Sequence, residues 1–142
     1  MINLKHTIFN YDKVIFLAPN DVTEFLNIAN ACEVEAIAYD YDPKYSDTPF
    51  YVNKDFVFDD VDMDADLFVH MNVEKTYPVK LPRGADVILI GDNEEHNGDC
   101  TPIHSCQQLI DLYNVGEVYD QGHDEDKTHY YVYGKIDENR IR

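Results

Sequence analysis

Four short apolar runs, each ending on an asparagine or an aspartate, constrain the fold of this chain more than any other feature. They occupy residues 14–20, 36–40, 67–72 and 87–92, and their last residues are Asn20, Asp40, Asn72 and Asp92. Continuous apolar runs with little alternation are typical of strands covered on both faces, as in parallel sheets. Ligands of open α/β sheets bind beyond the carboxyl ends of such strands. The runs therefore predict a parallel core with hydrogen-bonding side chains gathered along one edge.

The segments outside these runs predict two helices and a hairpin. Asp21 begins a capping box, and the apolar residues that follow at helical spacing predict a helix over residues 21–31. Ser105 is a candidate N-cap for a second helix within residues 103–113. Alternating residues on either side of a polar turn are typical of an antiparallel hairpin, and two further short strands are expected. The hairpin strands fall at residues 117–120 and 128–134, and the short strands at 50–52 and 56–58.

This order of elements predicts an α/β fold. Alternating strands and helices followed by an antiparallel pair describe a mixed sheet with parallel strands at its centre and a C-terminal hairpin. The length of 142 residues fits a single domain over residues 1–142. Within it, residues 1–12 form an N-terminal segment and residues 135–142 a charged tail.

The charge of the chain restricts its partners. With 28 acidic and 11 basic residues, the net charge is -17. Such a surface repels nucleic acid and anionic membranes, so we expect direct binding to neither, and a basic protein is the expected partner. Two interpretations of the charge stay open: it confers solubility or reflects a salty habitat, or it mimics a phosphate backbone and blocks a nucleic-acid-binding protein.

The sequence predicts a soluble, cytoplasmic protein. The N-terminus carries polar residues where a signal peptide would be apolar, and no apolar run approaches the roughly 20 residues needed to cross a bilayer. The three cysteines form no disulfide framework, which agrees with a reducing compartment.

Three segments resemble the class I S-adenosylmethionine-dependent methyltransferases, particularly the small methyltransferase-like proteins of tailed bacteriophages. The segments are residues 36–43, 66–78 and the closing strands 117–120 and 130–134. In those phage proteins the middle segment reads roughly Asp-hydrophobic-Asn-x-x-Cys-Glu-His-Met. Here Asn72, Glu74 and Pro78 keep parts of that pattern, whereas Lys75 and Thr76 replace the His-Met pair. The resemblance implies a Rossmann-like methyltransferase-type sheet, S-adenosylmethionine as cofactor, and the cytoplasm of a phage-infected host.

The resemblance also implies roles for particular residues. Asp40 or Asp42, at the end of the second run, would hold the cofactor's ribose, and Asp59 or Asp60 would face its adenine. Asn72 and Glu74 would be the catalytic pair, orienting a substrate amine or acting as a general base, although polar residues leaving a strand have the same appearance. The first turn of the family would contribute further cofactor contacts from Ala18 and Asn20.

One departure from the family bears on activity. The family turn carries a Gly-x-Gly pattern, because backbone must approach the cofactor closely and only glycine adopts the required angles at little cost. Residues 18–21 contain no glycine, and the φ angle of Pro19 is fixed. Two hypotheses follow: a small methyltransferase-like enzyme that binds its cofactor unusually, or a non-catalytic descendant that works as an acidic binding protein. Such a binding protein would act on a host nucleic-acid enzyme, as a DNA mimic, or as a component of a phage assembly.

A cluster of histidines and cysteines precedes the second predicted helix. Its members are His96, Cys100, His104 and Cys106, which are suitable zinc ligands. Their spacing matches none of the common zinc-finger or zinc-ribbon patterns, so we predict no metal site.

Overall fold

The computed structural model describes residues 3–19, 22–40, 43–45, 47–57, 59–93 and 101–137. The helices in these residues are α1 (Leu4–Ile8), α2 (Val22–Cys32) and α3 (Cys106–Tyr113), with the short 3₁₀ helices η1 (Pro43–Tyr45) and η2 (Val73–Lys75). The strands are β1 (Lys13–Leu17), β2 (Glu35–Asp40), β3 (Tyr51–Asn53), β4 (Leu67–His70), β5 (Asp86–Asp92), β6 (Val115–His123) and β7 (His129–Ile136).

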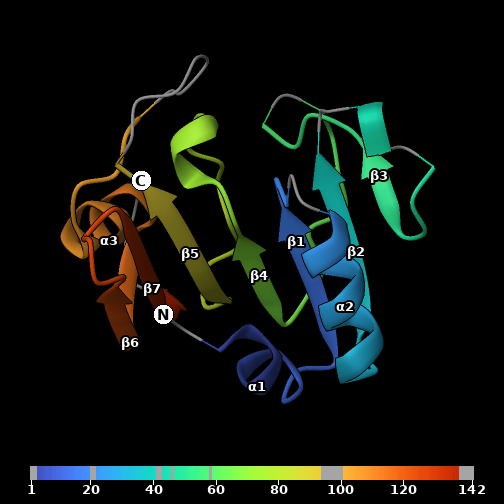
Figure 1. Ribbon diagram of the computed structural model, residues 1–142, viewed down its shortest axis with the longest axis horizontal. Coiled ribbons are helices and arrows are strands. Elements are labelled where there is room, and N and C mark those ends of the chain that lie inside the picture. The colour runs from blue at the N-terminus through green and yellow to red at the C-terminus, as the bar shows by residue number, and fades with distance from the viewer. Residues whose placement is uncertain are drawn as a thin grey trace.

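The described strands form one seven-stranded sheet in the order β3-β2-β1-β4-β5-β7-β6. The pairs from β3 through β5 are all parallel, and β7 runs antiparallel to both β5 and β6. In Figure 1 the arrowheads of β1, β2, β4 and β5 accordingly point toward the same end of the molecule. The predicted mixed sheet, with parallel core strands and a C-terminal antiparallel hairpin, is confirmed.

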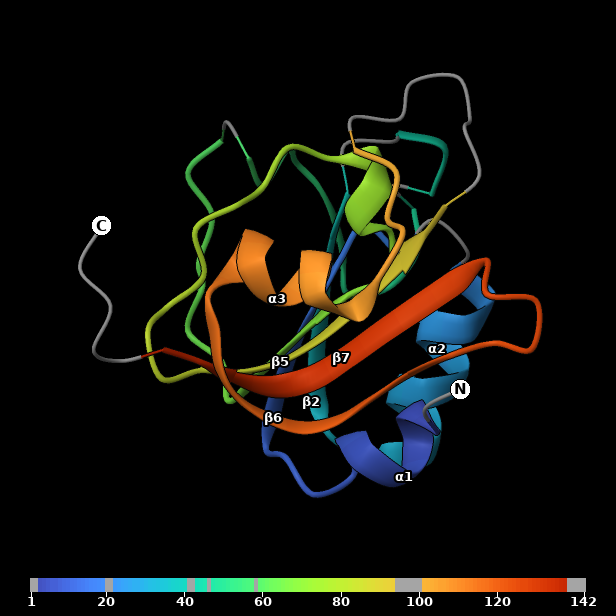
Figure 2. The same cartoon turned by 90° about the vertical axis from the view of Figure 1, so that its left-hand side faces the viewer.

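Helices cover the two faces of the sheet separately. Figure 2 shows α3 on one side of the sheet and α1 and α2 on the other. On the α1–α2 side, Phe25 of α2 packs edge-on against Phe16 of β1, with the ring centroids 5.1 Å apart. On the α3 side, Leu109 and Tyr113 join a core that also contains residues from the irregular segments before and after β4. The apolar runs are thus buried because both faces are covered, as their composition predicts.

Two predicted elements differ in extent from the structure. The N-terminal segment 1–12 contains α1, whose N-cap Asn3 accepts a hydrogen bond from the His6 amide at 3.1 Å. Strand β7 continues to Ile136, and so enters the segment assigned to the charged tail, because the Ile136 amide bonds the Ala85 carbonyl at 2.9 Å.

The strand predicted at residues 56–58 is wrong for the two residues that the structure describes there. The Asp55 carboxylate accepts a hydrogen bond from the Val57 amide at 3.0 Å, and the Asp55 carbonyl accepts one from the Asp59 amide at 2.7 Å. These local bonds form a turn and compete with strand pairing.

Among the helices that the structure describes, none combines the length and apolar character needed to cross a bilayer.

Candidate functional site

Three of the four apolar runs end side by side. The register places Leu17 of β1 opposite Tyr39 of β2 and opposite His70 of β4. The pairing continues one step further, because the Ala18 amide bonds the Tyr39 carbonyl at 2.9 Å and the Met71 amide bonds the Leu17 carbonyl at 3.1 Å. The residues at the carboxyl ends of these strands therefore gather at one edge of the sheet. We call this edge the rim, and it is formed by Ala18, Asp40 and Asn72.

The turn after β1 is strained at Ala18. This residue is 5% exposed and has a φ of 49°, in the left-handed region that favours glycine. For a residue with a side chain this conformation costs about 1–2 kcal/mol. The Asn72 side chain donates a hydrogen bond of 2.5 Å to the Ala18 carbonyl and so helps to hold the turn. The backbone adopts here the kind of angle that the missing glycine would provide, and such strain clusters at ligand sites.

Asp40 is the acidic member of the rim. It is the last residue of β2 and only 4% exposed. Its carbonyl accepts hydrogen bonds from the Lys54 amide at 2.9 Å and from the Asn53 side chain at 3.2 Å, which fix the backbone. A carboxylate held at this position can accept hydrogen bonds from two neighbouring hydroxyl groups. Asn20 and Asp42, which were predicted to lie beside it, are outside the described residues.

Asp59 and Asp60 follow the turn at Asp55. Both are exposed, and the Asp59 carboxylate accepts a hydrogen bond from the Asp55 amide at 2.9 Å. Within the described residues, no hydrogen bond or ion pair joins either aspartate to Ala18 or Asp40. Their contact with an adenine ring stays a prediction.

The two predicted catalytic residues occupy different surroundings. Asn72 is half-buried, and its side-chain amide is used in the bond to Ala18. Glu74 lies in η2 with 3% of its surface exposed, and its carbonyl accepts the Thr101 amide at 3.1 Å. Asn72 thus positions the turn, whereas any contact of either residue with a substrate stays a prediction.

A buried polar pair beside the rim was not predicted from the sequence. His70, the last residue of β4, is 0% exposed, and its Nε2 lies 3.0 Å from the Thr76 hydroxyl oxygen. Burial lowers the pKa of His70 to about 3, so its ring is neutral at physiological pH. The ring also packs edge-on against Phe56 and Tyr113. The only sequence signal for it is that His70 interrupts an otherwise apolar strand.

The fourth run ends at the hairpin. Asp92 is the last residue of β5, and one of its carboxylate oxygens lies 3.3 Å from Nε2 of His129. The Nδ1 atom of the same ring lies 3.1 Å from the Asp124 carboxylate. His129 therefore bridges the end of a parallel strand to the hairpin turn, although 46% of its side chain remains exposed.

The predicted histidine and cysteine cluster is only partly described. His96 and Cys100 lie outside the described residues. The Cys106 thiol donates to the Gly122 carbonyl at 3.3 Å, and burial raises its pKa. Elsewhere in the described ranges, no three histidine, cysteine or acidic side chains gather in a way that would hold a metal ion.

Comparison with known proteins supports the fold. No protein-family model matches this sequence, and no curated protein resembles it significantly. Among solved structures, it is similar to an O-methyltransferase family protein from Burkholderia thailandensis, with a TM-score of 0.57, 8% identity, and coverage of 98% of this chain and 54% of that one. It is also similar to the S-adenosylmethionine-dependent methyltransferase SibL, with a TM-score of 0.62, 10% identity, and coverage of 94% and 53%.

A third similar structure contains a bound cofactor product. It is the N-methyltransferase NodS from Bradyrhizobium japonicum WM9 in complex with S-adenosyl-L-homocysteine, with a TM-score of 0.56, 14% identity, and coverage of 89% of this chain and 78% of that one. The chain spans about half the length of the first two structures. These likenesses show that it has the Rossmann-like fold of methyltransferases.

Proposed function

We propose that this protein binds S-adenosylmethionine at the rim. The observation that carries the proposal is a buried carboxylate, Asp40, beside a turn held in the left-handed conformation at Ala18. The fold is shared with an S-adenosylmethionine-dependent methyltransferase and with an N-methyltransferase in complex with S-adenosyl-L-homocysteine. The carboxyl ends of parallel strands are also where ligands of open α/β sheets bind.

The residues of the rim fit the chemistry of this cofactor. The Asp40 carboxylate would accept hydrogen bonds from the two ribose hydroxyls, and the Ala18 turn would let backbone approach the ligand. Asn72 would keep that turn in place through its bond to the Ala18 carbonyl. When bound, the cofactor supplies an electrophilic methyl group on a positively charged sulfur, and a net charge of -17 attracts such a cation.

Methyl transfer is a further step in the proposal. Asn72 and Glu74 follow β4 and are the candidates to meet an acceptor, but in this structure Asn72 bonds the turn and Glu74 is buried. An enzyme would need these side chains to reach a substrate. The phage origin implied by the sequence resemblance is likewise part of the proposal, and its support is the resemblance alone.

Calorimetric titration with S-adenosylmethionine and with S-adenosylhomocysteine tests the proposal. We expect micromolar binding that weakens about 10- to 100-fold in Asp40→Asn, because hydrogen bonds to a charged group contribute about 1.5–3 kcal/mol. Asp126→Asn is the matched control, since it removes the same charge from an exposed position in the hairpin turn. No heat from either ligand, or equal affinity in Asp40→Asn, would contradict the proposal, provided that circular dichroism shows the variant folded.

The alternative is a non-catalytic acidic binding protein. Its support is the excess of 28 acidic over 11 basic residues, together with the engagement of Asn72 and the burial of Glu74. A competition assay separates the alternatives: a phosphate-backbone mimic should displace duplex DNA from a basic DNA-binding protein at low salt and lose this effect as salt screens the charges. Failure to displace DNA at any salt concentration would remove the mimic hypothesis.

A further inference from the structure

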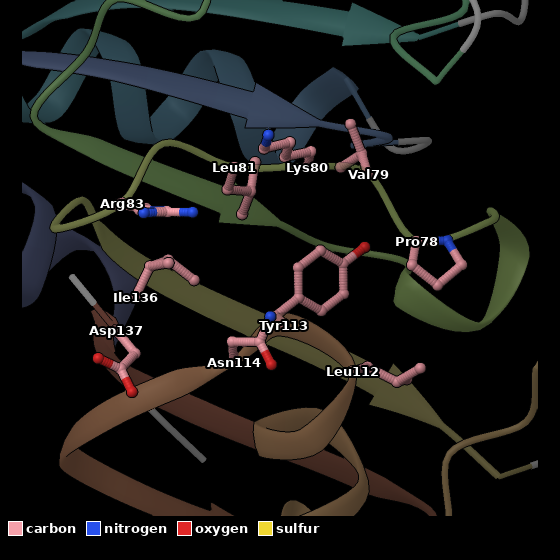
Figure 3. A pocket seen from close by; sticks show the side chains of 10 residues that line it. All are labelled: Pro78, Val79, Lys80, Leu81, Arg83, Leu112, Tyr113, Asn114, Ile136 and Asp137. Carbon is pink, nitrogen blue, oxygen red and sulfur yellow. The ribbon is translucent and has the colours of Figure 1, made fainter. Parts of the chain in front are cut away.

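A hollow lies on the face of the sheet that α3 covers. Its volume is about 300 Å³, and it lies between residues 78–83, the last turn of α3 and the end of β7 (Figure 3). Val79, Leu81, Leu112 and Ile136 provide apolar walls. A concave site of this size, with mostly apolar walls and a few polar groups, has the usual form of a small-molecule pocket.

This pocket is distinct from the rim. One of its ends lies where β5 begins, because the Gly84 amide bonds the Ile136 carbonyl at 3.1 Å and the Ile136 amide bonds the Ala85 carbonyl at 2.9 Å. The rim, in contrast, lies where the parallel strands end. Tyr113 lines the pocket and packs edge-on against His70, with their ring centroids 6.0 Å apart. Buried rings therefore stand between the pocket and the end of β4.

The charges at the pocket are unusual for this chain. Lys80 and Arg83 both line it and are exposed, although the chain has 28 acidic residues for only 11 basic ones. Within the described residues neither cation forms an ion pair or a hydrogen bond, even though Asp137 also lines the pocket. Two cations without acidic partners in so acidic a protein provide a local site for an anion.

The polar groups lie at separate positions around the hollow. Figure 3 shows Arg83 at one end and the Tyr113 hydroxyl directed toward the other, near Pro78 and Val79. The Tyr113 oxygen is buried and makes no hydrogen bond of normal geometry in the described part of the chain. Burial raises the pKa of Tyr113 to about 12, against the smaller opposing effects of the Val79 backbone and the Thr76 side chain, so the hydroxyl keeps its proton. It is thus available as a donor.

We propose that this pocket binds a small organic anion consisting of a carboxylate on a short apolar or aromatic body. The Arg83 guanidinium presents several donors in one plane, which suits two parallel hydrogen bonds to a carboxylate, and Lys80 adds a second positive charge. The apolar body would lie against Leu81, Leu112 and Ile136. The proposal is independent of the cofactor at the rim, so its test needs no cofactor.

Phenylacetate is a suitable probe, and phenylacetamide is its neutral counterpart of the same shape. The isotope-labelled protein is titrated with each compound up to about 10 mM, and binding is followed by the shifts of its backbone amide NMR signals. This concentration range suits the weak affinity expected of a ligand this small. We expect saturable shifts with phenylacetate at Val79, Leu81 and Ile136, no comparable shifts at Ala18 or Asp40, and binding of phenylacetamide at least tenfold weaker.

Three variants test separately whether binding needs the Arg83 charge and whether it needs the space inside the pocket. Arg83→Gln should weaken phenylacetate binding at least tenfold, whereas Lys127→Gln, which removes one positive charge from the exposed hairpin turn, should leave it unchanged. Leu112→Trp should fill the hollow and abolish binding. Equal binding of the acid and the amide, shifts outside the pocket, equal losses in Arg83→Gln and Lys127→Gln, or no binding of phenylacetate would each overturn the proposal.

Discussion

Acidification should destabilise this protein through the buried ring of His70. The ring is 0% exposed and has one polar contact, from Nε2 to the Thr76 hydroxyl oxygen at 3.0 Å. Its Nδ1 atom is buried and has no hydrogen-bond partner among the described residues. A protonated ring would place a positive charge in this core without an acidic partner. The folded protein therefore resists protonation of His70, whereas the unfolded chain does not.

The size of the effect follows from the pKa of His70, which burial lowers from 6.5 to about 3. Between these two values the unfolded state binds a proton that the folded state does not. The free energy of unfolding therefore falls as the pH falls below 6.5, by about 1.4 kcal/mol per pH unit, until it levels off near the folded-state pKa. Between pH 6.5 and about 4.5 the loss from this residue is about 2 kcal/mol, because the full slope is reached only below pH 6.5.

Urea unfolding of the natural protein and of His70→Phe at about pH 7, 5.5 and 4.5 measures this effect. Phenylalanine keeps an aromatic ring in the core but cannot titrate. The difference in unfolding free energy between the two proteins should shift by about 2 kcal/mol in favour of His70→Phe at the lowest pH, because contributions of the acidic residues cancel in the subtraction.

The exposed His104 provides the control. His104→Phe makes the same replacement at a ring that lies on the surface before α3, so it controls for the exchange of histidine for phenylalanine outside the core. A difference for His70→Phe that stays constant between about pH 7 and 4.5 would refute the reasoning, because it would show that the buried ring takes up its proton in the folded state.

Three stability predictions follow from the backbone and can be checked by urea unfolding. Glu33 is exposed after α2 and has a φ of 53°. Glu33→Gly should raise the free energy of unfolding by about 1 kcal/mol, because relief of the left-handed strain exceeds the cost of the added chain entropy. Glu33→Ala should give no such increase. Gly134→Ala should lower the free energy of unfolding by about 2–3 kcal/mol or more, because the added Cβ would clash with the Glu117 carbonyl oxygen. Gly122→Ala should lower the free energy of unfolding by less, since its added Cβ would meet only a tyrosine side chain. Ser105→Ala should lower the free energy of unfolding by about 1 kcal/mol, because it removes the hydrogen bond that the Gln108 amide donates to the N-cap side chain. Ser105→Asp, which keeps a capping oxygen, should retain most of that stability.

The arrangement of the parallel strands could be predicted from the sequence because burial on both faces leaves a direct mark on composition. Apolar residues occupy most of β1, β4 and β5 without alternation, and the ends of β1, β2 and β4 lie side by side as the runs predict. The cap of α3 could be predicted for a similar reason, since Ser105 bonds an amide only three residues away. Local rules suffice where the partners are near in sequence.

Other features depend on contacts between distant residues. Helix α1 has only five residues, so its own propensity is marginal, and burial of Leu4 and Ile8 stabilises it. The left-handed turn at Ala18 depends on Asn72, which is 54 positions further along the chain. The burial of His70 depends on Phe56 and Tyr113 packing around it. None of these pairings leaves a periodic or local signal in the sequence.

A crystal structure of the protein with S-adenosylhomocysteine shows directly whether the cofactor product binds at the rim. We predict that the ligand lies across the ends of β1, β2 and β4, with its ribose hydroxyls bonded to the Asp40 carboxylate and its chain beside Ala18. A ligand bound elsewhere, or an empty rim at saturating ligand concentration in a lattice that leaves the rim open, would contradict it.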